Sequence, residues 1–390
     1  MKRGETNQGA RVIDLDGFRG LVLALHSRGY ALFGPRMADN AIVFDEIQSP
    51  DDLVVGWTDR QEPGRYRLER GGDGAMFGYV VGPHSWKKYL FPPKERLVQI
   101  SRNGNLVTAS PEALDDAKRA LIGVRACDLA AIAVQDKVFT SGAYVDPHYQ
   151  SRRRSIFIVA VNCGAPASTC FCTSMATGPE ARTGFDLALT EVIGEGRHEF
   201  VVDIGTELGG LVLSEVSSRE ASASDLDRKR SIVDQAERRI SRRLEIKDIK
   251  DLLYRNYEST HWTTVAERCV SCANCTLVCP TCFCSTVEDV TDLSGDHAER
   301  WRRWDSCFTL DFSHIVGGST RASTGGRYRH WMTHKLATWQ DQFDTMGCVG
   351  CGRCITWCPV GIDITEEIAA LRANEQSPGR KDKEKAHDRH

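Results

Sequence analysis

The chain has 390 residues, of which 41% are hydrophobic, and it carries a formal net charge of −3. This length allows two or three domains with a substantial core, and the near-balanced charge gives no general affinity for nucleic acid. Fifteen cysteines, an odd number in a chain of this size, do not fit a secreted disulfide scaffold and favour reduced thiolates that bind metal.

The sequence gives no sign of export or membrane insertion. No apolar segment follows Met1–Glu5, so a secretory signal peptide is not predicted. The longest uncharged stretch runs from Ser155 to Pro179, and it is interrupted by Asn162, Gly164 and Pro166. Such a stretch is unsuited to a membrane helix. We therefore expect a soluble, cytoplasmic protein with no membrane span and no nucleic-acid partner.

Residues 1–215 are predicted to form an α/β domain. Apolar runs predict strands at 41–44, 120–124, 156–161 and 200–204. Helical patterns lie at 17–27, 128–138 and 185–193. This alternation favours a mixed or parallel sheet with helices on its faces.

Four cysteines of this domain predict a metal site. Cys127 follows the strand expected at 120–124, and Cys163 follows the strand expected at 156–161. Residues just beyond the carboxyl ends of strands converge on one edge of such a sheet, and Cys170 and Cys172 lie on the loop that comes next. We expect these four thiols to meet, although their spacing does not specify a cluster type. The alternative is four unrelated buried thiols.

The rest of the chain divides into three further segments. Residues 216–256 are charge-rich, and apolar residues recur every fourth position from Ile232 to Leu244, which predicts a surface helix linking two domains. Residues 257–368 hold the other eleven cysteines, and the polar segment 369–390 is predicted to be a disordered tail.

Two cysteine runs in the segment 257–368 share the pattern C-x2-C-x2-C-x3-C-P, which is the ferredoxin signature for a [4Fe–4S] cluster. In two-cluster ferredoxins the fourth cysteine of each run ligates the other cluster. The predicted ligands are Cys269, Cys272, Cys275 and Cys358 for cluster A, and Cys348, Cys351, Cys354 and Cys279 for cluster B. Cys279 and Cys348 stand 69 positions apart (348 − 279), so the segment between them is an insertion within one ferredoxin-like unit.

Other interpretations of these cysteines are weaker. Zinc sites use two cysteine pairs with a spacer between them, which this pattern lacks. The spacing Cys275-x3-Cys279-x2-Cys282 matches the bare pattern of radical-SAM enzymes, but Thr281 replaces the usual aromatic residue. Cys282, Cys284 and Cys307 are left over. We expect them to pack as small apolar residues, with service as reserve ligands as the alternative.

Several longer blocks carry a family resemblance. They are Gly123-Val-Arg-Ala-Cys-Asp-Leu129, Thr169-Cys-Phe-Cys-Thr-Ser-Met175, the Cys-Pro-Thr-Cys-Phe-Cys ending at Cys284, Arg303-Trp-Asp-Ser-Cys307 and Gly347-Cys-Val-Gly-Cys-Gly-Arg-Cys354. Together they resemble the β subunits of cytoplasmic [NiFe] sulfhydrogenases and the iron–sulfur subunits of anaerobic sulfite reductases.

This resemblance implies an iron–sulfur electron-transfer subunit in a complex. The two cysteine runs predict two [4Fe–4S] clusters, and the four N-terminal cysteines leave a third iron–sulfur cluster open. The implied partners are a flavin subunit that binds NAD(P)H and the large and small [NiFe] hydrogenase subunits, or, in the alternative, a sirohaem sulfite reductase subunit. The chain contains neither G-x-G-x-x-G after a strand nor G-x4-G-K-[ST], which agrees with a flavin and nucleotide held elsewhere.

We expect a hydrogenase complex, in which no side chain of this chain acts as acid, base or nucleophile. A radical-SAM-type enzyme and a protein with purely structural clusters are the other classes considered. The predicted fold is an α+β or α/β N-terminal domain, a helical linker and a ferredoxin-like helical domain with two [4Fe–4S] clusters.

Overall fold

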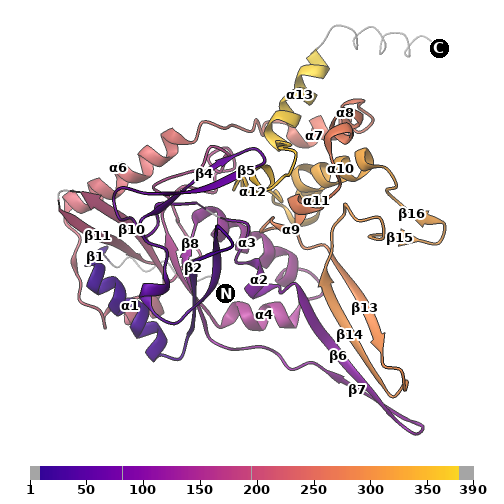
Figure 1. The fold of residues 1–390 in the computed structure, drawn as a ribbon, viewed down its shortest axis with the longest axis horizontal. Coiled ribbons are helices and arrows are strands. Elements are labelled where there is room, and N and C mark those ends of the chain that lie inside the picture. The colour runs from indigo at the N-terminus through magenta and orange to yellow at the C-terminus, as the bar shows by residue number, and fades with distance from the viewer. Residues whose placement is uncertain (1–8, 81, 195, 377–390) are drawn as a thin grey trace.

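A computed structural model describes residues 9–80, 82–194 and 196–376. An eight-stranded mixed sheet, in the order β12-β1-β11-β10-β9-β8-β2-β3, dominates the N-terminal half (Figure 1). Neighbours among β2, β8, β9 and β10 pair in parallel, and the flanking strands pair antiparallel. The strands are β1 (Arg11–Asp14), β2 (Ala31–Ala38), β3 (Ala41–Ile47), β8 (Arg119–Val124), β9 (Ile156–Val161), β10 (Leu187–Gly194), β11 (Arg197–Ile204) and β12 (Arg219–Glu220).

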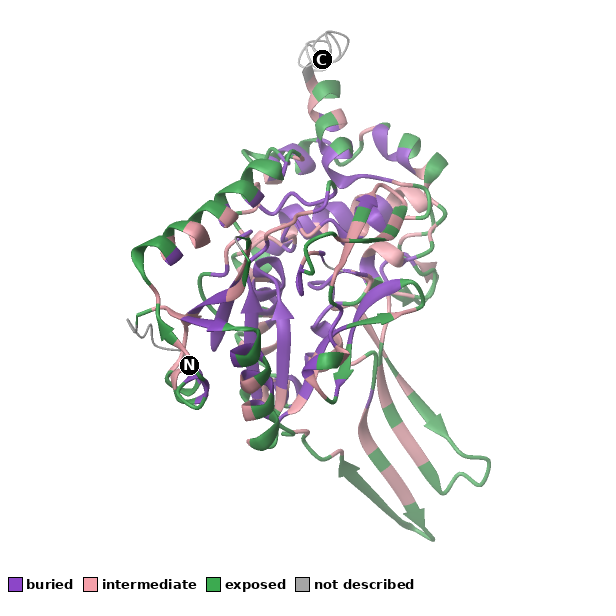
Figure 2. Ribbon diagram, turned by 60° about the vertical axis from the view of Figure 1, so that its left-hand side comes forward, coloured by how far each residue is buried: buried purple, intermediate pink, exposed green. Residues whose placement is uncertain are grey.

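Both faces of this sheet are covered by helices. Successive side chains of a strand point to opposite faces, and Ile122 and Val159 pack in the core on which α1 (Leu15–Ser27) and α5 (Glu207–Leu213) lie. Their neighbours Leu121 and Ile158 belong to the opposite core, with α2 (Lys87–Leu90), α3 (Ala126–Thr140) and α4 (Pro147–Arg154). The central strands β8 and β9 are accordingly buried, apart from the half-buried Arg119 at the start of β8 (Figure 2). The N-terminal region is thus mixed α/β, as predicted.

The elements expected in the N-terminal region and the linker are found with two differences. Residues 185–193, expected as a helix, form strand β10 instead. Leu187–Leu189 lie between β9 and β11 with both faces covered, and an unbroken apolar run suits such a central strand. The helix expected through Leu244 is α6 (Ala223–Arg239), which ends at its C-cap Ile240. An irregular segment then leads to α7 (Ile249–Arg255), although Leu244 remains buried.

The C-terminal part is a helical assembly around a second apolar core that includes Trp262, Trp331, Met332 and Leu371. Its elements are α8 (His261–Arg268), α9 (Asn274–Leu277), α10 (Thr324–Thr333), the π-helical turn η2 (His334–Thr338), α11 (Trp339–Phe343), α12 (Arg353–Thr356) and α13 (Ile364–Gln376). Helix α13 enters the segment 369–390 that was expected to be a disordered tail, because the fully buried Leu371 anchors it. Residues 377–390 lie outside the described part of the chain.

A four-stranded antiparallel sheet projects from the body as an arm (Figure 1). Its strands are β6 (Lys94–Asn103), β7 (Leu106–Pro111), β13 (Ser285–Thr291) and β14 (His297–Trp304), in the order β13-β14-β6-β7. The central pair, β6 with β14, joins the N-terminal region to the insertion between the two cysteine runs. The arm is largely exposed (Figure 2).

Short elements complete the structure: β4 (Trp57–Glu62), β5 (Arg65–Arg70), β15 (His314–Ile315), β16 (Gly318–Ser319) and η1 (Pro50–Asp52). Within the described ranges, the chain contains no helix of the length and apolarity that a membrane crossing requires.

Candidate metal centres

The two cysteine runs adopt the same backbone shape. In each, the residues on either side of the second cysteine have positive φ: 52° at Ser271 and 67° at Ala273, against 67° at Gly350 and 76° at Gly352. A short helix follows in both cases, α9 after the first run and α12 after the second. Two similar loops therefore present their cysteines in the same way, as a pair of related cluster-binding loops would.

Cys358, from the second run, lies with the first three cysteines of the first run. Cys269, Cys272, Cys275 and Cys358 line one cavity, together with Cys354. Burial, followed by the neighbouring thiols of Cys269, Cys358 and Cys272, raises the pKa of Cys275 well above its usual value. The backbone N–H of Ile362 donates to Cys358 Sγ at 3.3 Å. This grouping agrees with the ligand set predicted for cluster A.

Cys279, from the first run, lies with the other three cysteines of the second. Burial, and then Cys351 and Cys279, raise the pKa of Cys348 to about 12 against the opposing effect of Lys335. Burial and the thiols of Cys348, Cys351 and Cys279 raise the pKa of Cys354 as well. The grouping agrees with the ligand set predicted for cluster B, and hence with crossed fourth ligands.

The donor set fits iron–sulfur clusters better than a single metal ion. Within residues 9–80, 82–194 and 196–376, no three His, Cys, Asp or Glu side chains converge closely enough to hold one ion. A zinc ion needs all its sulfur ligands at about 2.3 Å from one point, whereas the four thiolates of a cubane surround it and bind different irons. Cluster binding would displace the protons that burial holds on these thiols.

The four N-terminal cysteines are brought together at the sheet edge where they were expected. Cys127 lies in the first turn of α3, directly after β8, and Cys163 follows the end of β9. All four thiols are buried. Burial, then Cys163 and Cys172, raise the pKa of Cys170, and burial, Cys163 and Cys351 raise that of Cys172 to about 12. A third thiol set therefore exists, and it reaches the second cysteine run.

The loop that carries Cys170 and Cys172 packs directly on the second run. Phe171 N donates to Gly350 O at 2.8 Å, and Cys170 Sγ lies 3.9 Å from Cys351 O. A Cβ atom on Gly350 would lie 2.7 Å from the Cys172 backbone. Glycine is required here because the two loops touch backbone to backbone.

Cys282, Cys284 and Cys307 gather at the root of the arm. The thiol of Cys282 contacts that of Cys279, and the thiol of Cys284 contacts that of Cys307. Cys282 and Cys307 are buried, and Cys284 is half-buried. The structure thus places the three leftover cysteines close to one another and next to the set predicted for cluster B.

Sequence reasoning missed several charged residues of these centres. The ammonium group of the buried Lys335 lies 3.2 Å from Cys279 Sγ and donates to Gly347 O at 3.0 Å. Lys335 belongs to no motif, and its place on the π-helical turn η2 is visible only in the structure. Asp128 and Arg353, which form a buried ion pair, stand next to Cys127 and Cys354 inside blocks that the sequence did single out.

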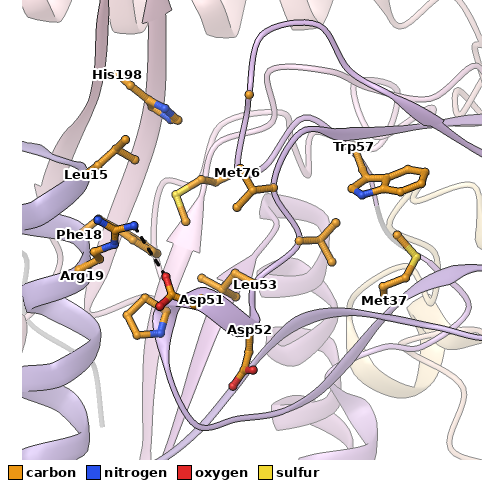
Figure 3. Close-up of a pocket in the computed structure, with 14 residues that line it drawn as sticks. Leu15, Phe18, Arg19, Met37, Asp51, Asp52, Leu53, Trp57, Met76 and His198 are labelled. Atoms are coloured by element: carbon orange, nitrogen blue, oxygen red, sulfur yellow. Dashed lines mark ion pairs between the residues drawn. The ribbon is translucent and has the colours of Figure 1, made fainter.

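A separate cavity of about 480 Å³ lies near α1 and η1 (Figure 3). Phe18, Leu53, Met76 and His198 are among its lining residues, and the ion pair of Arg19 with Asp51 crosses it. No cysteine is among the described residues that line it. The cavity is therefore separate from the thiol sets.

Comparisons with known proteins point to one family. Residues 268–362 match the model of the 4Fe-4S dicluster domain. The chain is 30% identical over 344 residues to sulfhydrogenase 2 subunit beta of Pyrococcus furiosus, an alignment that covers 87% of this chain and 92% of the relative. No solved structure matches the chain significantly.

Proposed function

We propose that this chain, which belongs to the family of sulfhydrogenase beta subunits, passes single electrons between a flavin subunit that binds NAD(P)H and a [NiFe] hydrogenase module. Membership of the family and the dicluster domain make it an iron–sulfur electron-transfer subunit of a sulfhydrogenase-like complex. The flavin partner and its exchange of electrons with this chain are part of the proposal.

The continuity of the thiol sets carries this proposal. Cys354 lines the cavity of the set predicted for cluster A while its thiol interacts with the set predicted for cluster B. Cys351 in turn interacts with Cys172 and Cys127 of the N-terminal set. The three sets therefore form one connected series from the helical assembly to the edge of the eight-stranded sheet.

The same observation supports a third cluster at Cys127, Cys163, Cys170 and Cys172. When bound, iron–sulfur clusters supply one-electron carriers whose potentials depend on charge, hydrogen bonding and burial. The chain's own residues hold the thiolates in place, donate to their sulfurs, as Ile362 N does to Cys358, and exclude water by packing Trp331, Trp339 and Phe171 around them.

Purification of the tagged chain from its native cells, under anaerobic conditions, tests the assignment. We expect a complex that contains flavin and nickel and in which NADPH or NADH reduces iron–sulfur signals of this chain. Sirohaem absorbance in place of nickel would instead identify the chain as a subunit of an anaerobic sulfite reductase, which is the alternative function. A chain that purifies alone, with clusters that no flavin protein reduces, would refute a relay function.

A further inference from the structure

Three cysteines at the root of the arm are not needed by the three thiol sets. Cys282 and Cys284 precede β13, and Cys307 follows β14. The antiparallel pairing of β13 with β14 closes the root, where Asp305 N donates to Cys284 O at 2.9 Å. The hairpin thereby fixes Cys284 beside Cys307, so their proximity is built into the fold and does not depend on the cysteine runs.

Two buried lysines point at this group. Lys87 Nζ donates to Cys282 O at 3.2 Å and lies 3.8 Å from the centre of the Trp304 ring. Lys335 Nζ lies 3.5 Å from Cys282 Sγ. The residues are only 4% and 3% exposed, respectively. Neither ammonium group has a carboxylate of the described residues within ion-pair distance.

These cations need an anionic partner. A buried ammonium group is unfavourable unless an opposite charge compensates it, and burial accordingly lowers the pKa of Lys87 to about 8. Lys335 lies 3.2 Å from the sulfur of Cys279, a predicted ligand of cluster B. Lys87 has no carboxylate of the described residues within ion-pair distance, and the thiol that acts on it most strongly is that of Cys282, followed by that of Cys279. Both lysines contact Cys282, Lys87 at its backbone oxygen and Lys335 at its sulfur. The thiolate sulfurs of a metal cluster held at this place would supply the negative charge beside them.

We propose that Cys282, Cys284 and Cys307 hold a further iron–sulfur cluster, whose thiolate charge Lys87 and Lys335 offset. Three cysteine thiolates suit a [3Fe–4S] cluster or a [4Fe–4S] cluster with one iron free of cysteine. The pairwise thiol contacts argue against a mononuclear site, as no three of the described donors converge on one point. This cluster goes beyond the proposed function, since the relay through the other three sets stands without it.

Iron and sulfide analysis of the full chain, reconstituted anaerobically, tests this cluster. We compare the wild type with the triple variant C282A/C284A/C307A. We expect the variant to lose about three or four irons per chain while it keeps the electron paramagnetic resonance (EPR) signals of the remaining clusters. Unchanged iron content would overturn the proposal. A Cys284–Cys307 disulfide in the alkylated, denatured wild-type chain would overturn it as well, since those thiols would then not bind iron.

A second measurement covers the case in which the triple variant does not fold. Lys87→Met should lower the midpoint potential of one EPR-detected signal, and Cys282→Ser should alter the lineshape of that same signal. Lys88→Met is the matched control, because the Lys88 side chain is half-buried and its Nζ lies near His84 Nδ1, at 3.5 Å. If Lys87→Met moves no signal, or only a signal that Cys282→Ser leaves unchanged, the proposal is wrong.

Discussion

Asp128 and Arg353 form an ion pair that is almost completely shielded from water. Arg353 Nη1 lies 2.9 Å from Asp128 Oδ1, and Arg353 Nη2 donates to Asp128 Oδ2 at 3.2 Å. The side chains of Arg353 and Asp128 are 0% and 1% exposed. Asp128 follows Cys127 on α3, while Arg353 stands between Cys351 and Cys354. The ion pair thus links helix α3, which carries Cys127 of the N-terminal thiol set, to the second cysteine run.

Removal of one partner should be costly because it leaves the other charge buried and alone. For Asp128→Asn we expect a loss of about 3–5 kcal/mol in the free energy of unfolding, measured by urea denaturation of the cluster-loaded chain under anaerobic conditions. The control is Asp227→Asn, which breaks an exposed pair with Arg230 and should change stability little. Equal effects of the two substitutions would contradict the buried role of Asp128.

The crossed fourth ligands make a prediction about which variants resemble each other. If Cys358 ligates the same cluster as Cys269, Cys272 and Cys275, Cys358→Ser should alter the same EPR signal as Cys272→Ser. Cys279→Ser should then alter the same EPR signal as Cys351→Ser. In the uncrossed case the pairs exchange, so that Cys358→Ser matches Cys351→Ser. Redox titrations followed by EPR on the four single variants decide between these outcomes.

The N-terminal thiol set predicts a separate loss of iron. In the double variant C170S/C172S, two of four ligands are gone, and we expect about four fewer irons per chain with both signals of the cysteine runs retained. Quantification of iron and acid-labile sulfide checks the prediction. Wild-type iron content in this variant would show that the four thiols pack without metal.

The sequence was most informative where chemistry dictates spacing. The two cluster-binding cysteine runs and the strands before Cys127 and Cys163 could be predicted, because ligand spacing and the convergence of strand ends are local rules, while the crossing of the fourth ligands stays a prediction. The assembly of the arm could not, since the pairing of β6 with β14 joins segments far apart in the chain. Nor could Lys335 be found, because a buried cation is recognisable only once its thiol neighbours are placed.

Strand β10 shows the same limit on a smaller scale. Its apolar run from Leu187 fits a helix or a buried strand equally well, and only its position between β9 and β11 decides for the strand. The three leftover cysteines were likewise ambiguous in the sequence. Two tertiary contacts resolve their place: the hairpin brings Cys284 to Cys307, and Lys87 reaches Cys282. Neither contact can be read from the sequence.

Lys335 should raise the reduction potential of the cluster that Cys279 ligates, because its charge lies 3.2 Å from that sulfur and favours the more negative, reduced state. At an effective dielectric constant of about 20, two unit charges 4 Å apart interact by about 4 kcal/mol. For Lys335→Met we therefore expect a fall on the order of 100 mV, measured by EPR-monitored redox titration. Lys250→Met, at an exposed ion pair, is the control and should leave all potentials unchanged.

Gly352 should be irreplaceable, although the first run has an alanine at the matching position. A Cβ atom on Gly352 would lie 2.5 Å from Thr169 O, and its φ of 76° disfavours any side chain. Ala273 adopts a φ of 67° in the first run, and its methyl group is accommodated in the core of the helical assembly. For Gly352→Ala we expect a loss of at least about 2 kcal/mol in stability, from the left-handed backbone and the forced displacement of the loop.

Ala273→Gly is the matched control and should be nearly neutral, because relief of its backbone offsets the loss of a buried methyl group. Thermal unfolding of both cluster-loaded variants measures the difference, and equal midpoints would contradict the contact between the two loops.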